Sequence, residues 1–139
     1  MTVLNSIQFN SIVVVTGVLA SSPNYPSNYP NNVNRTDSLQ VESGKLLRME
    51  FSSFYIQYSY KCKSDYIKIT DADGTILMDR SCGRNYPSAS SDFFLPPIIT
   101  TLTNSVNVLF HTDRFSQYPG WKLNWTSVTP GLKHYTLSS

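Results

Sequence analysis

The sequence predicts an all-β protein in which two antiparallel sheets pack as a β-sandwich. The first observation is composition, because nine Tyr, seven Phe and two Trp occur in a chain with only 14% charged residues, which suits half-buried strands. The second is spacing, since short alternating runs recur every ~8 to 12 residues with turn residues between them. The third is that no convincing amphipathic helix interrupts these runs.

Length and charge narrow the class of protein further. A chain of 139 residues fits one domain, because compact domains cluster around ~100 to 150 residues. The net charge of +2 comes from scattered Lys and Arg, which do not form the dense basic stripe that follows a phosphate backbone. We therefore expect one core, and we expect no nucleic acid among the partners.

The two ends of the chain are set apart from the predicted domain. A secretory signal peptide needs a positively charged start, and residues 1–11 contain no Lys or Arg. Residues 1–15 are therefore expected to be a leader of another origin or a first-strand segment. The apolar run Ile12–Ala20 is about half the ~20 residues that span a bilayer, so we expect no membrane span. The domain is predicted over 16–128, and 129–139 is predicted to be a tail or linker.

Strands alternate with turns through the first half of the domain. Three prolines in Pro23–Asn32 exclude a helix and a central strand there, and the tyrosines among them favour an ordered loop. Strands are predicted at Ser38–Val41 and Leu46–Phe54, joined by a turn at 42–45. The buried face of the longer strand is predicted to carry Leu47, Met49 and Phe51.

The second half of the domain continues this pattern. Tyr66–Thr70 and Thr75–Met78 form a predicted hairpin around the turn 71–74. A further strand, Ser105–His111, alternates apolar and polar residues. The last strand places three large side chains on one face, and these are predicted core residues: Trp121, Leu123 and Trp125.

The two cysteines, Cys62 and Cys82, bear on whether the protein resides in a reducing or an oxidising compartment. By count alone, two buried thiols and a disulfide are equally open interpretations. Asn34 and Asn124 each begin an N-glycosylation sequon, and such sites carry glycans only in a secretory compartment. The sequons therefore favour a secreted or extracellular protein, where a disulfide persists.

A series of motifs follows in order along the chain. They are SPNYP at 22–26, YPNN at 29–32, C-x-x-D-Y at 62–66, SCG at 81–83, V-x-V-x-F at 106–110 and GW at 120–121. This order resembles the CUB domain, an extracellular module of complement proteases, astacin-type proteases, neuropilin-like receptors and spermadhesins. The resemblance covers roughly 16–127 and implies a jelly-roll-like β-sandwich.

Some positions depart from the family pattern. The frequent first cysteine pair is absent, with Arg35 near the place of its second member, and Asp37 stands where a Trp is usual. The retained pair, Cys62 and Cys82, is predicted to form a disulfide. Calcium-binding members carry a Glu five residues before the first retained cysteine, where this chain has Gln57.

The resemblance implies a calcium site assembled from several loops. Its ligands would be Tyr29, Gln57, Asp65, Asp113 and an oxygen near Ser116. Because calcium takes ~6 to 8 oxygen ligands and its affinity follows their charge, the neutral amide at position 57 should weaken the site. The alternative is that the two aspartates cap turns by accepting backbone N–H groups.

The function that the resemblance implies is non-catalytic recognition of an extracellular protein through loops at one end. The contacts would include Tyr29, Arg114 and Phe115, and a basic side chain of the partner would meet the acidic site. The alternative is a spermadhesin-like module that binds glycans or anionic polysaccharide. An enzyme is not expected, because His111 and His134 provide little material for a Ser-His-Asp triad or a His-based zinc site.

Overall fold

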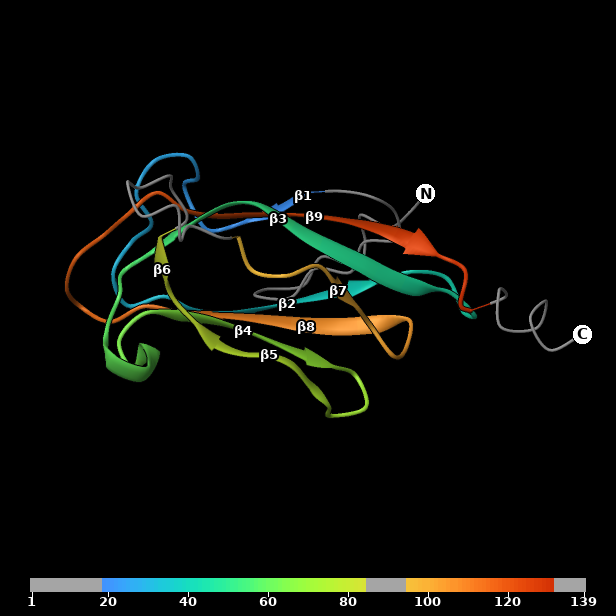
Figure 1. The fold of residues 1–139 in the computed structure, drawn as a ribbon. Coiled ribbons are helices and arrows are strands. Elements are labelled where there is room, and N and C mark those ends of the chain that lie inside the picture. Colours follow the sequence, from blue (N-terminus) through green and yellow to red (C-terminus); the bar gives the residue numbers. More distant parts are fainter. Residues whose placement is uncertain (1–18, 85–94, 132–139) are drawn as a thin grey trace, which may run out of the picture.

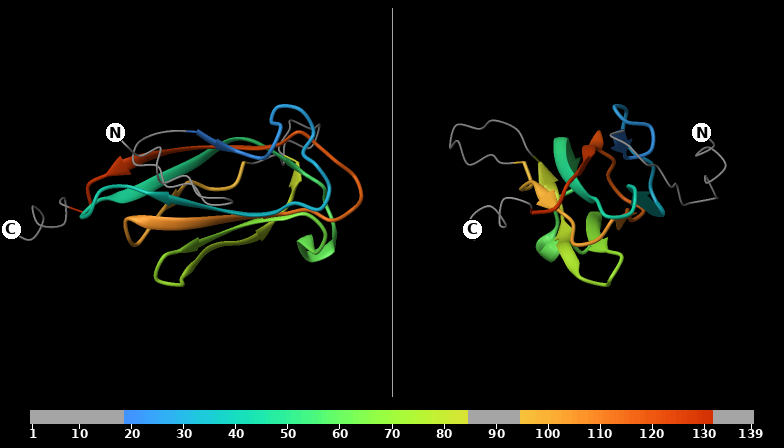
Figure 2. Two further views of the ribbon diagram at one scale, coloured as in Figure 1. Left: turned by 180° about the vertical axis from the view of Figure 1, so that it is seen from behind. Right: turned by 90° about the vertical axis from the view of Figure 1, so that its right-hand side faces the viewer.

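The computed structural model of the chain describes residues 19–84 and 95–131. Within these ranges, nine strands form two antiparallel sheets that pack face to face (Figures 1 and 2). The first sheet has the order β1-β9-β3-β6, with β7 paired to a different part of β3, and the second has the order β2-β8-β4-β5. The predicted β-sandwich is confirmed.

One 3-10 turn, η2, lies between β3 and β4. The bounds of the elements are β1 Leu19–Ser21, β2 Asn34–Gln40, β3 Leu46–Ile56, η2 Tyr60–Cys62, β4 Tyr66–Asp71, β5 Ile76–Ser81, β6 Gly83–Arg84, β7 Ile99–Thr100, β8 Ser105–His111 and β9 Gly120–Val128. No helix among the described residues is long and apolar enough to cross a membrane.

The predicted strands differ from the observed ones mainly at their ends. β8 has the predicted bounds, whereas β2 begins at Asn34 and not at Ser38. The polar start of β2 shows no hydrophobic alternation, and its pairing with β8 along all of its length holds it in the sheet. The segment 1–15 and most of the predicted tail lie outside the described residues.

The core lies where the inner faces of the two sheets meet. The predicted inner residues of β3 and β9 are 0–2% exposed: Leu47, Met49, Phe51, Trp121, Leu123 and Trp125. Trp121 makes edge contacts with Phe51 and Phe110, at centroid distances of 6.2 and 5.8 Å. Burial of each large apolar side chain contributes roughly 1.5–3 kcal/mol. Asn124 is exposed between buried neighbours, which confirms the predicted register of the last strand.

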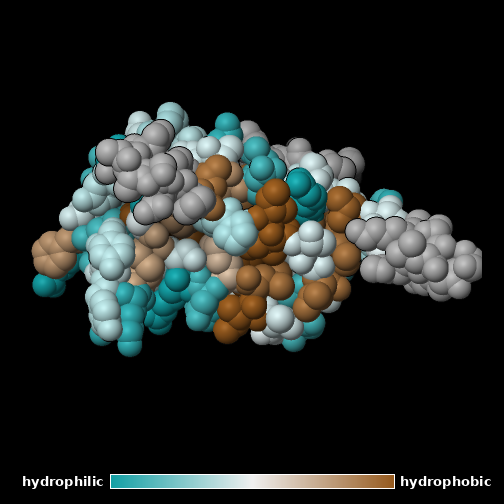
Figure 3. All heavy atoms as spheres, in the orientation of Figure 1, coloured by the Kyte–Doolittle hydropathy of each residue, from teal (hydrophilic) through white to brown (hydrophobic). Residues whose placement is uncertain are grey.

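Two further features of the fold are a disulfide and an exposed apolar patch. Cys62 and Cys82 are bonded, with a Cα–Cα distance of 5.6 Å, so the predicted disulfide is confirmed and η2 is tied to the junction of β5 and β6. Apolar side chains gather over the side of the sandwich where β5 and β7 lie (Figure 3). Their most exposed members are Ile76, Ile98 and Leu102.

Arg35 forms an ion pair within β2 and links the edges of the two sheets through a hydrogen bond to β1. Arg35 Nη2 lies 2.9 Å from Asp37 Oδ2 and donates a 2.7 Å hydrogen bond to the carbonyl oxygen of Ser21 in β1. It occupies the region where the resemblance places the absent cysteine. Asp37 Oδ1 and Arg35 Nε are buried without hydrogen-bond partners. Burial raises the pKa of the Asp37 carboxyl, although the guanidinium opposes the rise.

This pair predicts a pH-dependent loss of stability when one partner is removed. The variant Arg35→Met should lose about 3 kcal/mol near pH 7, because it leaves the Asp37 carboxylate buried and unpaired. The loss should shrink toward roughly pH 4, because a native pKa above the unfolded value makes stability fall as pH rises. Urea unfolding at both pH values measures this loss. The control is the double variant Arg35→Met/Asp37→Leu, which should regain stability because it removes the unpaired carboxylate. An equal loss at both pH values would refute the account.

Candidate functional site

Three loops and the short strand β6 gather at one end of the sandwich, because β1, β3 and β8 end there while β2, β4 and β9 begin there. We call this surface the loop end, at the left in Figure 1. It comprises residues 22–33, 57–65, 82–84 and 112–119. The loops belong to both sheets, so a group placed among them can be held from both sides of the sandwich.

Tyr29 is the centre of the loop end and is fully buried. Its hydroxyl donates a 2.7 Å hydrogen bond to Asp65 Oδ2 and accepts one of 3.0 Å from the backbone N–H of Gln57. Gln57 directly follows β3 of the first sheet, and Asp65 directly precedes β4 of the second. One phenol therefore joins the two sheets at this end.

The second aspartate continues the same network. The backbone N–H of Asp113 donates to Asp65 Oδ1 at 2.8 Å, and Asp113 Oδ1 accepts from the N–H of Phe115 at 2.9 Å. The carbonyl oxygen of Asp113 accepts from the N–H of Asn32 at 2.8 Å. Both carboxylates thus accept backbone N–H groups, as the turn-capping alternative expects, and the structure also brings Tyr29, Gln57, Asp65 and Asp113 into one network.

Electrostatics at the pair of aspartates favour a cation. Burial raises the pKa of the Asp65 carboxyl, and the nearby Asp113 charge raises it further, whereas N–H and O–H donors act in the opposite direction. Burial also raises the pKa of Tyr29, and the hydrogen bond to Asp65 adds to the rise. A positive ion would favour the ionised form of Asp65, which these surroundings disfavour.

The oxygen atoms present fit a weak calcium site. Gln57 Oε1 is buried and has no hydrogen-bond partner, and calcium binds amide and carboxylate oxygens. Two aspartates contribute the charge, and the described residues contain no group of three or more His, Cys, Asp or Glu that could hold a metal. A site with these ligands would lack the third carboxylate, which agrees with the weakening expected from Gln57.

Another buried oxygen of the loop end was not anticipated. Asn31 Oδ1 is buried without a partner, and the next residue, Asn32, bonds to the carbonyl of Asp113. The YPNN motif marks this position, but only the fold shows which of its side chains is enclosed. Asn31 is therefore a second residue of the loop end, after Gln57, with a buried and unpartnered amide oxygen.

The remaining predicted contact residues lie on the 112–119 loop. Arg114 and Phe115 are exposed, and the guanidinium lies 4.8 Å from the centroid of the Phe115 ring. Ser116 is exposed and has a φ of 57°, in the left-handed region that ordinary residues adopt rarely. These residues are accessible to a partner beside the acid pair.

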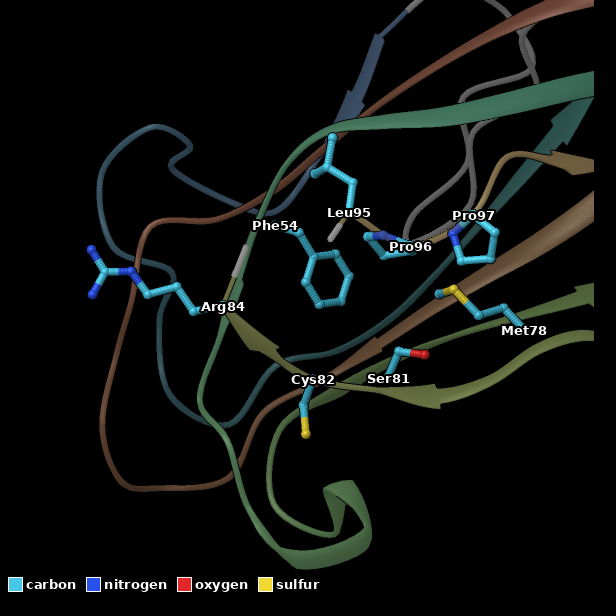
Figure 4. A pocket seen from close by; sticks show the side chains of 8 residues that line it. All are labelled: Phe54, Met78, Ser81, Cys82, Arg84, Leu95, Pro96 and Pro97. Atoms are coloured by element: carbon cyan, nitrogen blue, oxygen red, sulfur yellow. The ribbon is translucent and has the colours of Figure 1, made fainter. Parts of the chain in front are cut away.

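Two hollows lie near the loop end. One of about 270 Å³ is lined by Tyr55, Ile56, Tyr58, Gly83, Arg84 and Tyr118. The other, of about 230 Å³, is lined by Phe54, Met78, Ser81, Cys82, Arg84 and residues 95–97, and the guanidinium of Arg84 points away from it (Figure 4). The tyrosine-lined hollow was not predicted, because its walls come from segments far apart in sequence.

Tight packing beneath Tyr29 holds it in place. Gly120 has a φ of +89°, and a Cβ there would overlap Ser22 Oγ and lie 2.8 Å from Ser22 Cβ and 3.3 Å from Tyr29 Cδ2. Ser22 is itself fixed, because its N–H donates to the Trp121 carbonyl and its hydroxyl accepts from the Trp121 N–H, each at 3.0 Å. The glycine is therefore required by both conformation and space.

The comparison with family profiles identifies the fold. The profile described as CUB domain matches residues 12–125, which is most of the chain. The chain therefore belongs to the CUB domain family.

Curated relatives agree with this assignment. The chain is 34% identical over 113 residues to Cubilin of Rattus norvegicus, an alignment that covers 81% of the chain and 3% of Cubilin. It is 36% identical over 118 residues to Embryonic protein UVS.2 of Xenopus laevis, covering 83% of the chain and 21% of that protein. The chain spans a small part of the length of these relatives.

Solved structures show the same fold. The crystal structure of the MASP-1 CUB2 domain bound to Ca2+ superposes with a TM-score of 0.68 at 27% identity, covering 84% of this chain and 96% of that one. The CUB1-EGF-CUB2 domains of rat MASP-1 superpose with a TM-score of 0.73 at 21% identity, covering 85% and 42%. The first of these neighbours was crystallised with calcium.

The packing at Gly120 predicts a specific rescue. Gly120→Ala should cost roughly 2–5 kcal/mol, because it combines a left-handed alanine with overpacking against Ser22. Ser22→Gly removes the obstructing atoms, so the double variant should be at least about 1 kcal/mol more stable than the sum of the singles. Chemical denaturation of the two singles and the double measures this. Strict additivity would show that Ser22 does not limit position 120.

Proposed function

We propose that the chain is a non-catalytic extracellular module that recognises a protein partner through the loop end, with a calcium ion as organiser. The observation that supports this most is the joined network of Tyr29, Asp65 and Asp113, which lies beside exposed aromatic and basic side chains. A small acidic centre held from two sheets is rigid, and rigid sites lose little entropy on binding.

Calcium would be held by oxygens of several loop-end residues. Asp65, Asp113 and Gln57 would supply ligands, with Tyr29 orienting Asp65 and an oxygen near Ser116 completing the set. The calcium-bound MASP-1 CUB2 neighbour supports the proposal, since it is 27% identical over most of the chain. The ion would neutralise the two carboxylates and fix the loops that meet a partner.

An extracellular location agrees with the covalent features of the chain. The disulfide Cys62–Cys82 suits an oxidising compartment. Asn34 and Asn124 are both exposed, on β2 of the second sheet and β9 of the first. A glycan at Asn124 would cover the outer face of the first sheet, whereas one at Asn34 would border the loop end, because Asn34 directly follows the segment 22–33.

The partner's approach follows from which groups are accessible. Asp113 is only partly buried, whereas Asp65 is fully buried, so a basic side chain of the partner would contact Asp113. The glycan-binding alternative relies on the exposed rings of Tyr58 and Tyr60, which are 73% and 69% exposed. Protein recognition is favoured, because the acid pair has no role in binding an anionic polysaccharide.

Calcium titration tests the role of position 57. Wild type should bind calcium weakly, with a Kd of about 10⁻³ M or higher, and Gln57→Glu should bind about tenfold more tightly because it restores a negative ligand. Isothermal calorimetry measures both, and thermal unfolding with and without calcium gives a second readout.

The control for this titration is Asp113→Ala, which should abolish binding in either background while the disulfide and β-sheet signals persist. Heat of binding that is absent from both wild type and Gln57→Glu would mean that the cavity is not a metal site. In that outcome the hydrogen bonds among Tyr29, Asp65 and Asp113 alone would hold the loops.

A further inference from the structure

The loop end carries more positive charge than its acid pair balances. Its loops contain two acidic residues, of which Asp65 is 0% exposed and Asp113 is partly buried. The same loops carry three basic residues, all of them exposed, which we call the cationic rim: Lys61, Lys63 and Arg114. A calcium ion at the acid pair would make this surface more positive still.

Two cations of the rim, and the neighbouring Arg84, lie over aromatic rings. The distances to the ring centroids are 5.3 Å from Lys61 Nζ to Tyr60, 4.4 Å from Arg84 Cζ to Tyr55 and 4.8 Å from Arg114 Cζ to Phe115. Such contacts stabilise a side-chain position modestly at exposed sites. A cation that is already positioned loses less rotamer freedom when it meets an anion of the partner.

The rim also presents apolar anchoring surface. Tyr58, Tyr60 and Phe115 are 73%, 69% and 56% exposed, and Tyr58 borders the hollow of about 270 Å³ that Arg84 and two further tyrosines line. In that hollow the rings of Tyr55 and Tyr118 stack with centroids 4.6 Å apart. Tyr and Arg around a small pocket are typical of the residues that dominate protein–protein affinity.

We propose that the loop end binds an acidic protein segment, whose carboxylates meet the cationic rim while an apolar or aromatic side chain enters the tyrosine-lined hollow. This inference rests on the proposed function and adds to it that the basic side chain meeting Asp113 belongs to a partner segment that is otherwise acidic. One basic side chain of the partner can reach Asp113 between flanking carboxylates, but an extended basic surface would face three cations and be repelled. A sulfated polysaccharide would leave the exposed rings of Tyr58 and Phe115 without apolar partners.

The test uses three polymers of defined charge, each titrated against the full chain in calcium. They are the random copolymers poly(Glu,Tyr) and poly(Lys,Tyr), and heparin. Poly(Glu,Tyr) should bind, and its affinity should fall about fivefold to tenfold in Lys61→Gln/Arg114→Gln, because each rim ion pair contributes modestly. The matched control, Lys45→Gln/Arg48→Gln, removes the same charge at the opposite end of β3 and should change affinity less than twofold.

The apolar part of the proposal has its own variant. Tyr58→Ser should weaken poly(Glu,Tyr) at least threefold and leave heparin unaffected, and thermal unfolding should confirm that all variants fold. The inference of an acidic partner would be overturned if Lys61→Gln/Arg114→Gln and Lys45→Gln/Arg48→Gln lost equal affinity for poly(Glu,Tyr). It would also be overturned if heparin bound more tightly than poly(Glu,Tyr). Preference for poly(Lys,Tyr), lost in Asp113→Ala, would overturn it while supporting the proposed function. Polymer binding insensitive to every loop-end variant would overturn both.

Discussion

The hydrogen bond from Tyr29 to Asp65, 2.7 Å long, is the interaction on which the loop end depends. The phenol also accepts the N–H of Gln57 at the end of β3, so one buried oxygen connects the two sheets where their loops meet. Through its other oxygen, Asp65 fixes the backbone of Asp113, which in turn anchors the loop that carries Arg114 and Phe115. Buried polar groups are costly when unpaired, and these partners therefore hold one another in a single arrangement.

The surroundings of Tyr29 explain why this arrangement is stable enough to support a surface. The ring packs edge-on against Phe110, with centroids 5.1 Å apart, and the space beneath it is closed by Gly120 and Ser22. The disulfide Cys62–Cys82 joins η2 to the start of β6, and thereby brings Lys61 to the same end as Arg84. The recognition surface therefore combines a rigid acidic centre, the disulfide-linked turn η2 and exposed aromatic rings. The core of the fold contributes stability and no contacts to a partner.

The sequence predicted those parts of the fold in which one face of a strand is buried. β3, β8 and β9 follow from strict alternation, because burial selects every second residue. The polar start of β2 and the two-residue strands β6 and β7 have no such pattern, since neighbouring strands hold them by backbone pairing. The acid pair was predicted from motif resemblance. The unpartnered oxygens of Gln57 and Asn31, the hollow beside Tyr118 and the cationic rim depend on which distant segments meet, and that is determined by topology.

A double-mutant cycle on Tyr29 and Asp65 tests the central claim most directly. Urea unfolding would be measured for wild type, Tyr29→Phe, Asp65→Asn and the double variant at neutral pH without calcium. If the hydrogen bond joins the sheets as described, each single change should cost about 2 kcal/mol. The double change should cost little more than one of them, which corresponds to a coupling free energy above about 1 kcal/mol. Costs that simply add, within about 0.5 kcal/mol, would show that the two residues act independently, and would contradict the account.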